Sequence, residues 1–218
     1  MRRVLVLRPE PGASRTIERA RQFGLDAVAA PLFAIEPIAW EALDASRFDA
    51  LLLTSANAVR HGGEELAKLR SLPVHAVGPA TAEAARDAGF AVASVGSEGA
   101  EQLLASLPSD LRLLHLAGQD RTDPGDATQA ITVIPVYSAK ALPSPDLTDA
   151  EGSVALIHSP RAGRRLAELV ANRDGIAIAA ISSAAAEAAG VGWTAIEVAD
   201  RPDDEALLAL AARLCNNA

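Results

Sequence analysis

The sequence predicts an α/β protein made of two similar lobes, each with a parallel sheet flanked by helices, joined by two extended connectors. Three observations predict this fold. The chain resembles itself at an offset of 104 residues, short apolar runs alternate with longer stretches of helical spacing, and half of the 218 residues are hydrophobic although only 3% are aromatic. Two lobes of about 100 residues can each fill a core with small aliphatic side chains.

The internal repeat includes turns as well as helices. At the 104-residue offset, Ser55 falls on Ser159, and the segment Ala82–Ala85 falls on Ala186–Ala189. A single period of about half the chain is too long for a solenoid, so it indicates two similar folding units with a shared surface. Such surfaces commonly bind ligands.

Periodicity predicts the elements in order. The strands are expected in β-branched or Leu-rich runs: Val4–Leu7, Ala27–Pro31, Ala50–Leu53, Val74–Val77, Leu111–Leu116, Thr132–Val136, Val154–Ile157 and Ile176–Ile181. The helices are expected in stretches rich in Ala, Glu and Arg: Ser14–Phe23, Ala56–Leu69, Thr81–Ala88, Ala100–Leu107, Arg161–Ala171, Ser183–Ala189 and Asp203–Leu214. Gly24 and Gly89 end two of them, and Asp203 and Asp204 complement the dipole of the last.

Two segments break this alternation. Glu36-Pro37 follows the second strand, and Ala139–Ala141 leads into Pro143-Ser144-Pro145 at the matching point of the second unit. Proline lacks an amide donor and stiffens the chain, which suits connectors better than central strands. We therefore expect the lobe boundaries here, although a simple duplication also permits two sequential lobes.

Small polar residues follow five of the predicted strands. Because open parallel sheets bind ligands at the carboxyl ends of their strands, these turns are the predicted binding site. Hydroxyls or glycine combine there with the unpaired N–H groups of helix starts, which can cradle an anion. The alternative is that Ser, Thr and Asn serve there only as N-caps. The candidate binding residues are Arg8, Arg15, Thr54, Ser55, Asn57, Gly78, Thr81, Ser159, Arg161, Ser182 and Ser183.

Arginines lie at these strand ends although the formal net charge is −8. Arginine suits bidentate contact with carboxylate or phosphate, so we expect a multiply anionic small molecule, with solvated helix faces as the alternative. Further arginines of this kind are Arg60, Arg121, Arg164 and Arg165. The acidic chain predicts no general attraction to nucleic acid or to anionic lipid. Neither Gly78-Pro79 nor Arg8–Gly12 has the spacing of a nucleotide-binding motif.

The histidines and the single cysteine indicate no metal or thiol chemistry. The four histidines lie far apart without HxH or HExxH spacing, so no metal site is expected. His75 and His115 fall inside apolar runs and are interpreted as ordinary strand residues, and the adjacency of His158 to Ser159 does not make a hydrolase. Cys215 lies where the chain is expected to fray. We expect a cytoplasmic protein, because no apolar run approaches export or membrane-spanning length.

Tyr137 is the only tyrosine and ends the strand that enters the second connector. A phenol is protonated at neutral pH, so it can donate a hydrogen bond to a departing oxygen. An amphipathic ring at a strand end is the structural alternative. Tyr137 is the candidate catalytic residue.

Taken together, these segments resemble the uroporphyrinogen-III synthase family over essentially the whole chain. The matching segments are Leu5–Pro9 with Gly24 and Pro31, Phe48–Val59 with its Thr54-Ser55-x-Asn57-x-Val59 motif, Val77–Ala82, and Pro135-Val136-Tyr137. Two positions depart from the pattern. Leu7 stands where a threonine is common, and Ser182-Ser183-Ala184 replaces a turn with glycine and threonine.

The resemblance implies a discontinuous first lobe of residues 1–35 plus 141–218 and a second lobe of residues 36–140. It also implies the reaction: hydroxymethylbilane, a linear tetrapyrrole with acetate and propionate side chains, loses water and cyclises to uroporphyrinogen III with inversion of the last pyrrole ring. No metal or organic cofactor is implied, and Tyr137 would assist the leaving hydroxyl.

As partners, we expect only this substrate, handed over by the upstream bilane-forming enzyme, and we expect a monomer without nucleic acid or membrane. A non-catalytic two-lobe sensor of tetrapyrroles or other polyanions is the alternative, and a phosphosugar-binding enzyme is a third reading.

Overall fold

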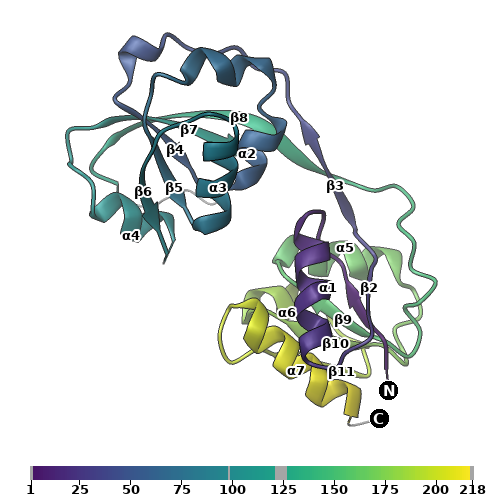
Figure 1. Ribbon diagram of the computed structural model, residues 1–218. Helices are drawn as coiled ribbons and strands as arrows, with labels where there is room; N and C mark the ends of the chain where they lie inside the picture. Colours follow the sequence, from purple (N-terminus) through teal and green to yellow (C-terminus); the bar gives the residue numbers. More distant parts are fainter. Residues whose placement is uncertain (1, 98, 121–126, 217–218) are drawn as a thin grey trace. The chain divides into compact units, whose positions relative to one another are not determined.

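The computed structural model describes residues 2–97, 99–120 and 127–216. The chain divides into two compact units (Figure 1). Unit 1 comprises Met1–Ala34 and Lys140–Ala218, and unit 2 comprises Ile35–Ala139. Each unit contains its own sheet and its own apolar core.

The sheet of unit 1 has five strands in the order β11-β10-β9-β1-β2, and every neighbouring pair is parallel. Its strands are β1 (Val4–Val6), β2 (Ala27–Ala29), β9 (Val154–Ile157), β10 (Ala177–Ala180) and β11 (Ala195–Val198). Its helices are α1 (Gly12–Gln22), α5 (Pro160–Leu169), α6 (Ser183–Ala189) and α7 (Asp204–Asn216). Apolar side chains of α1 and α7 pack in one cluster with β1, β9 and β10, while α5 and α6 pack closely against each other.

The sheet of unit 2 has six strands in the order β3-β8-β7-β4-β5-β6, and the pairs from β8 to β6 are parallel. Its strands are β3 (Phe33–Pro37), β4 (Ala50–Leu53), β5 (Val74–Val77), β6 (Val92–Gly96), β7 (Arg112–Gly118) and β8 (Ala130–Ala141). Its helices are α2 (Ala56–His61), α3 (Pro79–Asp87), α4 (Ala100–Ala105) and the 3-10 segments η1 (Ala45–Arg47) and η2 (Glu64–Leu69).

The two sheets share one strand order. The series β8-β7-β4-β5-β6 in unit 2 matches β2-β1-β9-β10-β11 in unit 1, and β4 (Ala50–Leu53) and β9 (Val154–Ile157) lie 104 residues apart. The sequence repeat therefore reflects two similarly wound sheets, and the predicted α/β class with parallel sheets flanked by helices is confirmed. In each unit the carboxyl ends of the parallel strands meet at one edge.

Three strands were missing from the sequence prediction: β3, β6 and β11. All three are outermost strands of their sheets. An edge strand buries less of its surface than a central strand, so its apolar pattern is weaker. Exposed apolar residues in β6 and β11, such as Val95 and Ile196, show this reduced burial.

Other expectations were also corrected. The helix expected over Ala56–Leu69 breaks after His61, because Gly63 adopts a φ of 64° and the chain continues as the 3-10 segment η2. The segments predicted as extended connectors, Glu36-Pro37 and Ala139–Ala141, lie at the ends of β3 and β8, and these two strands run across the divisions of the chain after Ala34 and after Ala139. Pro37 is tolerated because it ends an edge strand.

Cys215 is also not at a frayed end. Its side chain belongs to the core cluster of unit 1, the residue is 3% exposed, and its thiol lies 3.4 Å from the carbonyl oxygen of Arg2. The helix α7 reaches Asn216, and packing of its apolar face holds Cys215 in the core of unit 1. Within the described parts of the chain, none of the helices combines the length and hydrophobicity needed to cross a bilayer.

Candidate functional site

The predicted site residues follow the carboxyl ends of the strands of both sheets. In unit 1, Arg8 follows β1, Ser159 follows β9 and Ser182 follows β10. In unit 2, Thr54 follows β4 and Gly78 follows β5. Each unit therefore presents its own polar edge, and the two edges are described separately.

Three of the predicted serines cap helices. The hydroxyl oxygens of Ser55, Ser159 and Ser182 accept hydrogen bonds from backbone N–H groups of α2, α5 and α6 at 3.2, 3.2 and 3.3 Å. Capping uses the oxygen as an acceptor, so each hydroxyl hydrogen is still available to a ligand. The neighbouring Ser183 is exposed in the first turn of α6.

The turn after β5 differs from the turn after β10 because of its backbone. Gly78 has a φ of 83°, a conformation that favours glycine, whereas Ser182 has a φ of −157° and is extended. The turn after β10 therefore has no need of glycine, and serine caps the helix instead. Thr81 lies in the first turn of α3 and is buried, with 5% of its surface exposed.

Thr54 is held by a histidine of the neighbouring strand. Its hydroxyl lies 3.0 Å from Nε2 of His115, which is 2% exposed in β7. This bond fixes the position of the Thr54 side chain at the carboxyl end of β4. The adjacent Asn57 is half-buried in α2, and its N–H donates to Ser55.

Tyr137 lies beside the end of β7 and rests on a glycine. It pairs in register with Gly118, and a Cβ at that glycine would lie 2.9 Å from ring atoms of Tyr137 and 3.0 Å from its hydroxyl oxygen. The ring of His61 is 6.3 Å away, measured between centroids. Among the described residues the Tyr137 hydroxyl has no hydrogen-bond partner, so it is available to a ligand.

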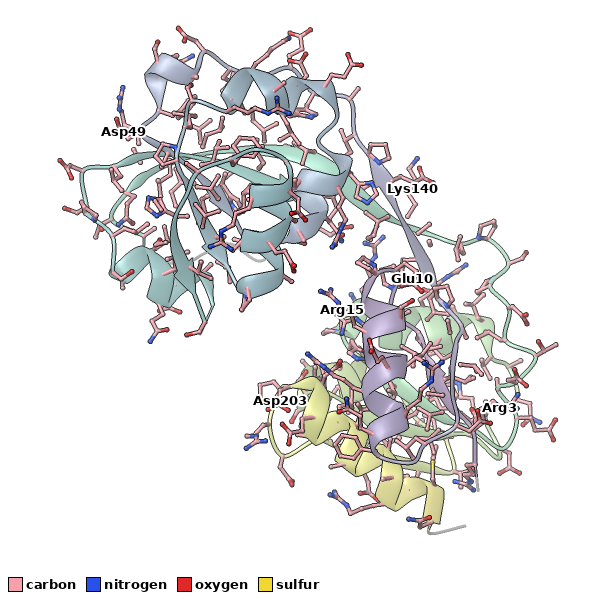
Figure 2. All side chains as sticks on the ribbon, in the orientation of Figure 1. Arg3, Glu10, Arg15, Asp49, Lys140 and Asp203 are labelled. Carbon is pink, nitrogen blue, oxygen red and sulfur yellow. The ribbon has the colours of Figure 1, made fainter. Side chains whose placement is uncertain are left out.

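The predicted arginines have different surroundings. The guanidinium of Arg161 lies 4.6 Å from the ring centroid of Phe33, a cation–π contact that orients it. Arg15 is exposed on α1 (Figure 2). Arg165 donates to the carbonyl oxygen of Leu142 at 2.9 Å, which gives it a structural role. Arg121 lies outside the described residues.

The structure also contains a buried charged network that sequence reasoning missed. The carboxylate of Asp204, at the start of α7, accepts hydrogen bonds from His158, Thr16, Arg8 and Arg19. Burial raises the pKa of Asp204, but the hydrogen bonds from His158 and Thr16 and the charges of His158 and Arg8 outweigh it and hold the pKa at about 2. Asp204 is therefore ionised at neutral pH.

These partners are far apart in the sequence. Asp204 lies 196 residues from Arg8 and 46 residues from His158, and only the strand order β9-β1 brings the three together. In the sequence, Asp204 has the pattern of an ordinary acidic residue at a helix start. The one local signal was its position as the first residue of α7, after the carboxyl end of β11.

Comparison with known proteins gives one family. The family model described as "Uroporphyrinogen-III synthase HemD" matches residues 14–209. The solved uroporphyrinogen-III synthetase from Helicobacter pylori is similar in fold, with a TM-score of 0.68 and 21% identity, over 98% of this chain and 100% of that one. A mutant uroporphyrinogen III synthase from the extremely thermophilic bacterium Thermus thermophilus has a TM-score of 0.50 and 18% identity, over 99% of this chain and 100% of that one. No curated protein sequence matches.

Proposed function

The chain belongs to the uroporphyrinogen-III synthase family, and we propose that it cyclises hydroxymethylbilane to uroporphyrinogen III with loss of water and inversion of the terminal pyrrole ring. The observation that carries this proposal is Tyr137, whose hydroxyl has no partner among the described residues and which lies over Gly118 at the end of β7. Units 1 and 2 are the two lobes of this enzyme in the proposal.

The proposed role of Tyr137 is to assist the departure of the terminal hydroxyl group. The lone pair of the pyrrole nitrogen replaces the electron pair of the C–O bond, and the hydroxyl leaves with that pair and a proton as water. A hydrogen bond from the phenol stabilises the charge that develops on the departing oxygen. The methylene carbon left behind is then attacked by the substituted α carbon of the pyrrole at the other end, which gives a spiro ring. The bond from that α carbon to its neighbouring methylene bridge breaks, and the bridge re-bonds to the unsubstituted α carbon, which inverts the ring. The proton lost from this last carbon balances the proton that leaves in water, and no covalent bond to the protein is required.

The other proposed contacts hold the substrate in a bent conformation. Its acetate and propionate groups suit Arg8, Arg15 and Arg161 of unit 1, together with the serine hydroxyls and helix N–H groups at the two sheet edges. Correct orientation of the two ends of one molecule can contribute a large part of the rate of ring closure. Thr54, Asn57 and Gly78 are the proposed contacts in unit 2.

We propose further that the enzyme acts in the cytoplasm as a monomer, needs neither a metal nor an organic cofactor, and receives its substrate from the enzyme that makes the bilane. Cyclisation with loss of water is redox-neutral and needs no co-reactant. Family membership supports the bilane as substrate.

The test is the isomer composition of the porphyrin formed from enzymatically generated hydroxymethylbilane. Type III product is expected with the protein present, and type I product in its absence. Only type I product together with measurable binding of the bilane would reject the synthase and favour a non-catalytic sensor. Protection from thermal unfolding by sugar phosphates, without bilane binding, would favour a phosphosugar enzyme instead.

A further inference from the structure

We propose that Asp204 is a positioning residue that orients the guanidinium of Arg8 toward a carboxylate of the substrate, with Gly12 leaving the space in which that guanidinium lies. This inference rests on the proposed function, since it names the group that anchors the same substrate in unit 1. Asp204 itself is not proposed to touch the substrate.

The carboxylate of Asp204 is fully occupied by protein donors. One oxygen accepts from Nε2 of His158 at 2.9 Å and from Nη1 of Arg8 at 3.4 Å. The other accepts from the hydroxyl of Thr16 at 2.8 Å and from Nη1 of Arg19 at 3.3 Å. A carboxylate has about four acceptor positions, and all are used here. Its side chain is 9% exposed, so its role is to hold its neighbours.

Arg8 has donors left over for a ligand. Its Nη1 is shared between Asp204 and the hydroxyl of Thr16, whereas the N–H groups of Nε and Nη2 have no partner among the described residues. About a third of the side chain, 35%, is exposed. The guanidinium is therefore held through Nη1 in a side chain that is still partly exposed, which favours binding of an anion without further ordering of the side chain.

The charges around Arg8 also favour an anion. Burial lowers the pKa of Arg8, the charge of Asp204 opposes this effect, and the nearby charges of Arg15 and Arg19 add to it. Two arginines, Arg8 and Arg19, thus share one buried carboxylate in this part of unit 1, and the charge of Arg15 acts on Arg8 without such a partner. A substrate carboxylate would relieve the repulsion between them.

Gly12 gives the second, independent constraint on Arg8. A Cβ built on Gly12 would lie 2.5 Å from Nε and 3.0 Å from Cζ of Arg8, far inside van der Waals contact. Gly12 begins α1, has no left-handed φ, and tolerates alanine as far as its backbone is concerned. Alanine would therefore displace the Arg8 guanidinium while the helix remains intact.

Among the residues of unit 2 that the structure describes, Asp204 and His158 have no counterparts of the same kind. At the repeat offset of 104 residues, Asp204 corresponds to Ala100 and His158 to Thr54. In addition, Nδ1 of His158 is buried without a hydrogen-bond partner, and the side chain is 9% exposed. Such an unsatisfied buried atom lowers stability, so stability alone does not account for the network. The asymmetry fits a division of roles in which unit 1 anchors the substrate and unit 2 carries Tyr137.

The test measures KM and kcat for hydroxymethylbilane in Asp204→Asn, Gly12→Ala and Arg8→Ala, alone and in pairs. Asp204→Asn and Gly12→Ala are each expected to raise KM by about tenfold with kcat within about twofold, because a charged hydrogen bond to the substrate is misdirected. In the Arg8→Ala background neither change should raise KM further, because both act through Arg8. The control is Asp203→Asn, one residue away and 46% exposed, which should leave KM unchanged.

Additive increases of KM in the Arg8→Ala background, or an unchanged KM in both single variants, would overturn the inference. Gly12→Ala retains Asp204, so it tests the inference even where Asp204→Asn fails to fold. A wild-type protein that makes no type III isomer would refute the proposed function separately. In that case, calorimetric titration with uroporphyrin, which carries the same carboxylates, tests the positioning of Arg8 without turnover. Binding about tenfold weaker in Gly12→Ala than in wild type would support the inference. Equal binding by the two proteins, or no binding by wild type, would overturn it.

Discussion

Replacing Gly118 by alanine should impair catalysis by moving Tyr137. The new Cβ would lie 2.9 Å from Cε2 and Cζ of the ring, whereas ordinary contact begins at 3.4 Å, so the ring must shift by at least about 0.5 Å. A misplacement of about 1 Å can lower a rate by about 100-fold. We therefore expect kcat to fall by about 10- to 100-fold, or about 1.4–2.7 kcal/mol in activation free energy.

The assay is the single-turnover rate of bilane consumption with enzyme in saturating excess over the bilane, with thermal unfolding measured in parallel. Gly118 has no left-handed φ, so its backbone accepts alanine, and the contact with the Tyr137 ring should lower the free energy of unfolding by about 1–3 kcal/mol. The matched control is Gly118→Ala in a Tyr137→Phe background, where no hydroxyl remains to be displaced. A kcat within twofold of wild type, or a loss equally large in the Tyr137→Phe background, would refute the reasoning.

Three further predictions concern stability and reactivity. Ser159→Ala removes the N-cap of α5 and should lower the free energy of unfolding in urea by about 1 kcal/mol; an unchanged midpoint would contradict this. Folding lowers the pKa of Asp204 from 3.8 to about 2, so ionised Asp204 stabilises the folded protein above pH 4. As the pH falls from about 4 to 2, the free energy of unfolding should decrease by up to about 2 kcal/mol. Asp204→Asn should lack this dependence, and parallel pH profiles would refute the assignment. Burial raises the pKa of the Cys215 thiol, so a thiol reagent should modify it only as fast as the protein unfolds; rapid labelling of folded protein would contradict the burial.

The alternation of strands and helices could be predicted from the sequence because most central strands are uniform apolar runs. The run Ala50–Leu53 is buried along its whole length, as is Val154–Ile157, and such runs are typical of parallel strands covered on both faces. The outermost strands β6 and β11 were missed because one of their sides faces no partner strand. Local pattern therefore identified the buried strands and not the limits of each sheet.

The candidate site was predictable in its location more than in its contacts. Ser55, Ser159 and Ser182 lie in the predicted turns after strands, and in the structure each hydroxyl oxygen accepts a hydrogen bond from a backbone N–H of the helix that follows it. Asp204 and Gly118 were not predicted, because what matters about them is a neighbour in space. Asp204 meets Arg8 only through the order of β9 and β1, and Gly118 meets Tyr137 only through the register of β7 and β8.

The most direct test of the central claim, that the Tyr137 hydroxyl assists loss of the substrate hydroxyl, compares the single-turnover rates of wild type and Tyr137→Phe. General acid assistance of this kind contributes about 10²-fold or more, so the variant should turn over about 100-fold more slowly while its dissociation constant for the bilane is unchanged. Equal rates with type III product from both proteins would contradict the claim.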